Sequence, residues 1–119
     1  MPEHGKLNYV EFPAEDLQAT KRFFNRTFGW EFVDYGPDYT SFANEGLDGG
    51  FFRASLCSEA LSGSALLVFY SNALQQTLEQ VVLNGGEILK PIFSFPGGRR
   101  FHFKEPSGNE FAVWSDKDS

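Results

Sequence analysis

The sequence is poor in cysteine and histidine and has no long hydrophobic run. It contains one cysteine, Cys57, so a disulfide within the chain is impossible. No base lies near Cys57 in the sequence to activate its thiol, which favours an inert side chain over a catalytic one. No apolar segment approaches the roughly 18 residues that a membrane-spanning helix needs.

Basic residues are also scarce. Ten Lys and Arg stand against 16 Asp and Glu, which gives a net charge of −6. An acidic surface repels phosphate backbones and anionic lipid headgroups, so we expect neither nucleic acid nor a membrane as a partner. The first residues lack the apolar core of a signal peptide, and a cytoplasmic location is therefore expected.

Phenylalanine, by contrast, is abundant. The 119-residue chain has 14 Phe, a hydrophobic content of 41% and a charged content of 22%. These values predict one folded domain, because the length suits one core and the charge is too low for disorder. So many rings require either a large aromatic core or a ring-lined pocket.

The first half of the chain predicts a strand, a helix and three strands. Residues 6–13 alternate polar and apolar side chains and stop at a proline. Asp16 is a candidate N-cap, and Gly29 is a candidate helix end. Apolar spacing places Leu17, Thr20, Phe24 and Phe28 on one helix face. The three following strands are expected at residues 30–35, 39–43 and 50–54.

The second half repeats this order after a small, polar linker at residues 55–64. A strand is expected at residues 65–71, followed by a helix that Asn72 caps, with Gln75 completing a capping box. The predicted buried face of this helix comprises Leu74, Leu78, Val81 and Val82. Three strands at residues 87–92, 99–104 and 109–115 follow. A half-chain of this size has too little core to be stable alone, so the two halves should join.

Four segments together resemble the vicinal oxygen chelate superfamily of glyoxalases, bleomycin-resistance proteins and extradiol dioxygenases. They are residues 9–17, 23–30, 84–87 and 105–109. The resemblance implies an α+β fold of two βαβββ modules, in which an open, curved mixed sheet surrounds a cavity and the helices lie outside. The modules would span about residues 6–54 and 65–115. Relatives commonly pair four modules, which implies a homodimer.

The resemblance also implies positions for metal ligands, but this sequence departs from them. Three of the four positions fall on Tyr9, Leu66 and Ala112, and residues 50–54, which hold the remaining one, contain no histidine or acid. Leucine and alanine offer no donor atom to a metal. We therefore predict that the usual metal site is absent and that the protein uses no metal or other cofactor.

Strand alternation predicts which side chains line the cavity. If Tyr9 faces it, so does Glu11, and the same argument places Tyr70, Glu110 and Trp114 inward. Phe101 and Phe103 look like core residues of the helix side, which puts Arg100 and His102 inward. The predicted ligand-binding residues are Tyr9, Glu11, Phe52, Tyr70, Arg100, His102, Glu110 and Trp114. An apolar, aromatic cavity with few polar groups is typical of a small-molecule site.

Several of these residues also have structural interpretations. His102 could be a hydrogen-bonded core histidine, and Arg100 could form an internal ion pair with Glu11 or Glu110. Trp30 and Trp114 could be packing residues or stacking platforms.

Three functions follow from these alternatives. The first is a metal-free protein that sequesters or senses a small, partly apolar ligand. The second is a glyoxalase- or dioxygenase-like enzyme, with unorthodox metal ligands or with acid–base catalysis by His102 together with Glu11 or Glu110. The third is an accessory protein that acts through its dimer or partner surface.

Overall fold

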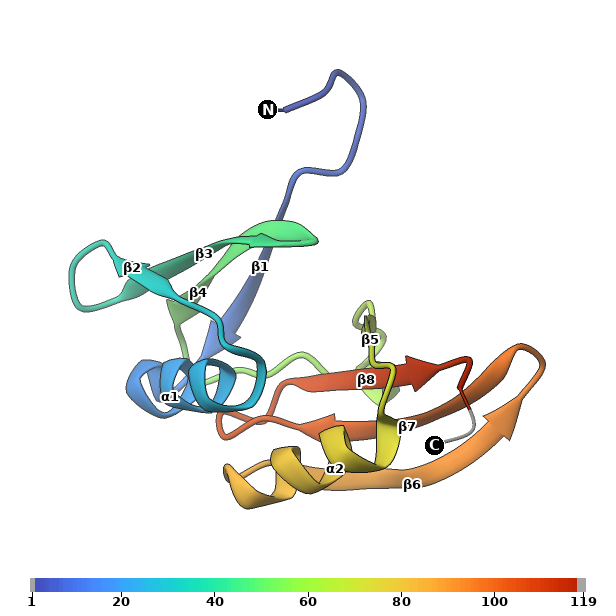
Figure 1. The fold of residues 1–119 in the computed structure, drawn as a ribbon. Coiled ribbons are helices and arrows are strands. Elements are labelled where there is room, and N and C mark those ends of the chain that lie inside the picture. The colour runs from blue at the N-terminus through green and yellow to red at the C-terminus, as the bar shows by residue number, and fades with distance from the viewer. Residues whose placement is uncertain (1, 118–119) are drawn as a thin grey trace.

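The computed structural model describes residues 2–117 and contains the predicted βαβββ unit twice (Figure 1). The fold is therefore α+β. The first module comprises β1 (Tyr9–Ala14), α1 (Leu17–Phe28), β2 (Phe32–Asp34), β3 (Tyr39–Glu45) and β4 (Leu47–Arg53). The second comprises β5 (Leu67–Tyr70), α2 (Leu74–Leu83), β6 (Glu87–Phe95), β7 (Gly98–Lys104) and β8 (Glu110–Ser115), after a short 3₁₀ helix, η1 (Ala60–Ser62). No helix within residues 2–117 is long and apolar enough to cross a membrane.

The strands form two four-stranded sheets with the same topology. The first, sheet A, has the order β1-β4-β3-β2, and the second, sheet B, has the order β5-β8-β7-β6. In each sheet the first strand of the module runs parallel to the last, and the other neighbours are antiparallel. Within the described residues β1 and β5 each pair with one strand only, so each leaves an open edge.

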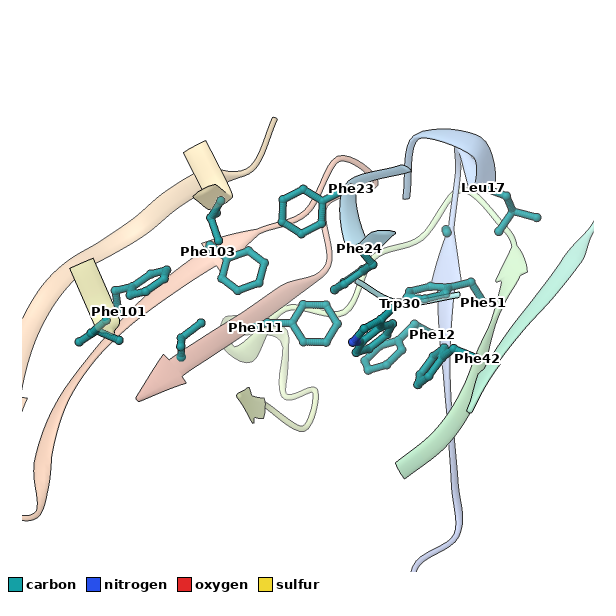
Figure 2. Close-up of a cluster of buried hydrophobic side chains, with 14 residues drawn as sticks. Phe12, Leu17, Phe23, Phe24, Trp30, Phe42, Phe51, Phe101, Phe103 and Phe111 are labelled. Carbon is teal, nitrogen blue, oxygen red and sulfur yellow. The ribbon is translucent and has the colours of Figure 1, made fainter. Parts of the chain in front are cut away.

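One aromatic core joins the two sheets. Phe24 of α1 lies 5.6 Å from the ring of Phe51 in sheet A and 5.4 Å from that of Phe111 in sheet B. Phe12 of β1 contacts Phe111 directly, with ring centroids 5.1 Å apart. Figure 2 shows rings from both sheets meeting around Phe24. The abundance of phenylalanine is therefore used mainly for a core that both modules share.

The predicted limits of α1 are confirmed. Asp16 accepts a hydrogen bond from the backbone N–H of Ala19, and Gly29 ends the helix with a φ of 75°, which glycine adopts without strain. The predicted cap of α2 is wrong, because Ala73 is the N-cap residue and makes no side-chain capping bond. The Ser71 hydroxyl instead accepts from the N–H of Ala73. Val82, predicted to be buried, is 52% exposed.

Strand limits differ from expectation where a ring or a turn changes the path of the chain. Trp30 precedes β2 and stacks on Phe24 at 4.6 Å, so it is a core residue and not part of the strand. The hairpin after β3 turns later than expected, because Asn44 stays in the strand with a φ of 67° and the register shifts around it. The predicted alternation in β7 is confirmed, since Phe101 and Phe103 are fully buried.

A buried carboxyl group ties the second module to α1. Glu105, at the end of β7, is 2% exposed and accepts hydrogen bonds from the Thr20 hydroxyl, the Ser107 N–H and the Asn109 amide. Asn109 also donates to the carbonyl of Pro13 and accepts from the N–H of Ser58. This cluster connects β1, α1 and the segment at 55–64 to sheet B.

The burial of Glu105 predicts a pH dependence of stability. Burial raises the pKa of Glu105 above its ordinary value, and the surrounding hydrogen bonds only partly oppose this. The folded state therefore holds the proton more tightly, so this group's contribution to stability is largest below pH 4.5 and declines as pH rises through the folded pKa. Urea unfolding at pH 4 to 8 should show the wild type losing stability relative to Glu105→Gln with rising pH. A stability difference between the wild type and Glu105→Gln that stays constant from pH 4 to 8 would contradict this account.

Candidate functional site

Each sheet has one face turned toward the aromatic core and one turned away from it, which we call its outer face. Residue alternation assigns Arg100, His102, Glu110 and Trp114 to the outer face of sheet B, since Phe101, Phe103 and Phe111 fill the core. Tyr9 and Glu11 lie on the outer face of sheet A, because Phe12 and Ala14 are buried. These residues therefore alternate with the core residues of their strands as predicted.

His102 and Glu110 form a buried pair on the outer face of sheet B. The Nδ1 atom of His102 lies 3.0 Å from the Oε2 atom of Glu110, and the two residues are 3% and 7% exposed. The other carboxylate oxygen accepts from the backbone N–H of Ala60 in η1. Burial alone raises the pKa of Glu110, but the bonds from His102 and Ala60 outweigh it and leave the pKa below its ordinary value. The Nε2 atom of His102 is buried without a hydrogen-bond partner in the described chain.

Arg100 lies on the same face among aromatic rings. Its guanidinium carbon is 5.4 Å from the ring centre of Phe93 and 5.6 Å from that of Phe95. Trp114 packs edge-on against Tyr70, with centroids 5.1 Å apart, and lies 6.3 Å from Phe95. Neither predicted ion pair of Arg100 occurs in the described residues of this chain, because Glu110 bonds His102 and Ala60, and Glu11 lies on sheet A.

A second polar cluster lies on the outer face of sheet A. The hydroxyl of Tyr39 donates to Glu11 over 2.9 Å and accepts from the hydroxyl of Tyr9. Burial raises the pKa of Tyr39, and the bonds to Tyr9 and Glu11 raise it further. Gly50 lies beneath this ring, where any Cβ atom would collide with the tyrosine hydroxyl. Phe52, also a predicted ligand contact, is 36% exposed nearby on β4.

The structure brings the predicted site residues together in two groups and not in one. Because the core-side faces of both sheets meet at Phe12, Phe24 and Phe111, the outer faces point away from each other. Tyr9 and Glu11 therefore do not converge with Arg100, His102 and Glu110 within one chain. Alternation along a strand determines these faces, but it carries no information about how two sheets are oriented.

Sequence reasoning missed Tyr39, Phe93, Phe95 and Ala60. The alternation in residues 39–43 could have placed Tyr39 with Ser41 on one face, since Phe42 is an obvious core residue. No signal pointed to Ala60, because the segment at 55–64 looked like a free linker. It instead packs on sheet B through Glu59, which forms an ion pair with Lys104 at 2.7 Å.

The positions at which the family resemblance implies metal ligands hold no cluster of donors in the described part of the chain. Within residues 2–117, no three His, Cys, Asp or Glu side chains lie close enough together to bind a metal ion. The absence of the usual metal ligands, expected from Leu66 and Ala112, agrees with this finding.

An apolar cleft of about 400 Å³ separates the open edges of β1 and β5. Its lining includes Val10 and Phe12 of β1, Leu67 and Phe69 of β5, and Trp30. Tyr70 is the one predicted ligand-binding residue that reaches this cleft, so the cleft and the polar clusters are different places in the molecule.

The model of the Glyoxalase/Bleomycin resistance protein/Dioxygenase superfamily matches residues 6–113. The chain belongs to this superfamily. Its resemblance in residues 9–17, 23–30, 84–87 and 105–109 is thereby confirmed.

Relatives of this superfamily member cover most of its length. It is 28% identical over 127 residues to a glyoxylase-like domain-containing protein of Didymella fabae, covering 92% of this chain and 93% of that one. CFP32 of Mycobacterium bovis is 23% identical over 125 residues, and these span 92% of this chain but only 45% of CFP32. A glyoxalase-related enzyme of Fulvimarina pelagi has the same fold, with a TM-score of 0.78, 21% identity and coverage of 93% and 88%.

The contacts on sheet B predict that two substitutions lower the free energy of unfolding by different amounts. Arg100→Leu should change the free energy of unfolding by less than about 1 kcal/mol, because no carboxylate loses a partner. His102→Ala should cost about 2 kcal/mol, because Glu110 then keeps a buried carboxylate with one donor fewer. Urea unfolding of both variants measures these changes in the free energy of unfolding. A loss of 3 kcal/mol or more in Arg100→Leu would mean that Arg100 is a structural ion-pair residue.

Proposed function

We propose that this protein binds a small, partly apolar molecule on the outer face of sheet B, without a metal ion. The observation that carries the proposal is the combination of Arg100 and His102 on one face. Each has a buried nitrogen without a hydrogen-bond partner in the described chain. Unpartnered buried donors and acceptors are costly, so they mark positions where a ligand, water or another chain supplies the missing bond.

The proposed binding protein is a homodimer. The open edges of β1 and β5 flank an apolar cleft, and Val68 and Tyr70 beside it are 44% and 51% exposed. An exposed apolar surface beside two unpaired strand edges is suited to a second copy. If β1 of one copy pairs with β5 of the other, the outer faces of sheet A and sheet B become continuous across the dimer. Tyr9, Tyr39 and Glu11 would then lie on the same surface as Arg100 of the partner subunit.

A thermal-shift screen over metabolites and drugs tests the binding proposal, because a ligand that prefers the folded state raises the unfolding midpoint. We expect at least one compound to raise the midpoint of the wild type and to have a much smaller effect on Arg100→Leu. No shift across a broad library, or equal shifts in both proteins, would contradict the proposal. Light scattering at tens of micromolar tests the dimer, and a monomer there would refute it.

A second candidate function is acid–base catalysis, which the His102–Glu110 pair favours. A carboxylate that holds one nitrogen of a histidine can orient the other nitrogen as a proton acceptor. The superfamily and the glyoxylase-like relative of Didymella fabae make a glyoxalase assay with methylglyoxal and glutathione the direct test. Turnover that requires both His102 and Glu110 would support an enzyme, whereas ligand binding without turnover would support the first proposal.

A further inference from the structure

Arg100 is a cation for which the described chain provides no counter-ion. It projects from β7 onto the outer face of sheet B, where its guanidinium packs against the rings of Phe93 and Phe95. Its Nε atom is buried and has no hydrogen-bond partner within residues 2–117. A guanidinium group carries five N–H donors, so an acceptor is missing from this position.

The carboxylates closest to this face already have other partners. Glu110 uses one oxygen for His102 and the other for the N–H of Ala60. Asp116 accepts from the hydroxyl of Tyr70, and Glu59 pairs with Lys104. Lys90 lies opposite His102 on β6 and adds a second positive charge to this region. None of these carboxylates is paired with Arg100 in the described chain.

The side chains around Arg100 indicate the shape of the molecule that would supply the missing hydrogen-bond acceptor. Trp114 and Phe95 lie beside each other at 6.3 Å, and Tyr70 contacts Trp114 at 5.1 Å. These rings offer flat apolar surfaces that favour stacking with another planar group. The planar fork of arginine matches the two oxygens of a carboxylate, which it can bind with two parallel hydrogen bonds. A single arginine suits a monoanion better than a doubly charged phosphate, which the net charge of −6 also repels.

We propose that Arg100 binds the carboxylate of a small aromatic acid whose ring stacks on the Trp114 and Phe95 side chains. This inference rests on the proposed function and specifies its ligand class. The Nε2 atom of His102, two residues along β7 on the same face, is buried and also lacks a partner in the described chain.

Titration calorimetry with three compounds of nearly the same shape tests the proposal. The probes are 2-naphthoate, the neutral 2-naphthamide and 2-naphthyl phosphate. We expect 2-naphthoate to bind the wild-type protein roughly 10- to 100-fold more tightly than the amide, as the loss of a charge-assisted hydrogen bond implies. The phosphate should bind more weakly than the carboxylate.

Variants assign any preference to Arg100. Arg100→Gln should bind acid and amide with equal affinity, and Arg100→Lys should keep only part of the preference because it loses the fork. Arg99→Gln makes the same charge change one residue away on the opposite face of β7, so it should retain the full preference. Circular dichroism checks that each variant is folded, and if Arg100→Gln is not, the Arg100→Lys comparison decides.

Several results would overturn the inference. They are equal affinity of the wild type for acid and amide, tighter binding of the phosphate, and a preference that survives in Arg100→Gln. No binding of 2-naphthoate at millimolar concentration, or a dimer weakened by Arg100→Gln without any ligand effect, would also overturn it. Equal binding of acid and amide would leave the proposed function intact. That function fails if the metabolite and drug screen finds no ligand, or if the wild type and Arg100→Leu show equal shifts of the unfolding midpoint.

Discussion

Replacing Phe24 by alanine is expected to lower the free energy of unfolding by about 3–5 kcal/mol, the range for large aromatic truncations in a core. Phe24 is fully buried and contacts rings of both sheets, including Phe51, Phe69 and Phe111. Its loss would open a cavity where the two modules join, and rigid neighbouring strands limit how far that cavity can close. Urea unfolding followed by circular dichroism measures the change.

Tyr35→Ala provides the control for this truncation. Tyr35 lies directly after β2 and is 65% exposed, so its removal should cost less than about 1 kcal/mol. If Phe24→Ala cost no more than Tyr35→Ala, the aromatic core could not be the contact that holds the modules together.

Asn109→Ala is expected to cost about 3 kcal/mol or more, because it removes three hydrogen bonds made by one fully buried side chain. The side chain is fully buried and bonds the Ser58 N–H, the Pro13 carbonyl and the Glu105 carboxylate, at 2.7, 2.7 and 2.8 Å. Alanine can replace none of these bonds. The loss should also release the segment at 55–64 from sheet B, which hydrogen exchange at Ser58 and Ala60 would detect.

Asn8→Ala makes the same chemical change at an exposed position before β1, and it should be nearly neutral. An Asn109→Ala variant as stable as Asn8→Ala, with unchanged exchange at Ser58, would show that water replaces the side chain. In that case the hydrogen-bond cluster would not be a determinant of the fold.

Much of the fold could be predicted because local patterns and the global structure agree. Asp16 and Gly29 have side-chain and backbone properties that define helix ends, and Phe101 and Phe103 alternate with polar residues along β7, as a strand with one apolar face requires. The cap of α2 could not be decided in this way, since Ser71 and Asn72 are both competent cap residues. The adjacent Ser71 hydroxyl supplies the bond to Ala73 instead.

The candidate site was predicted only in part, for a physical reason. Alternation gives the face of each strand, so Arg100, His102 and Glu110 could be placed on one face of sheet B. The orientation of the sheets depends on packing between residues far apart in sequence, such as Phe12 and Phe111, and many arrangements satisfy the same alternation. For this reason the sequence could not show that Tyr9 and Glu11 lie on a different surface from Arg100.

The most direct test of the central claim is to locate ligand binding with the two tryptophans. Trp114 lies on the outer face of sheet B beside the Arg100 cluster, whereas Trp30 is 5% exposed and lines the apolar cleft. Protein labelled with 5-fluorotryptophan gives one fluorine resonance for each, and a Trp114→Phe variant assigns them. Titration with the compounds that raise the unfolding midpoint should shift the Trp114 resonance and leave that of Trp30 unchanged. A shift confined to Trp30 would place the ligand in the cleft between β1 and β5 and contradict the account.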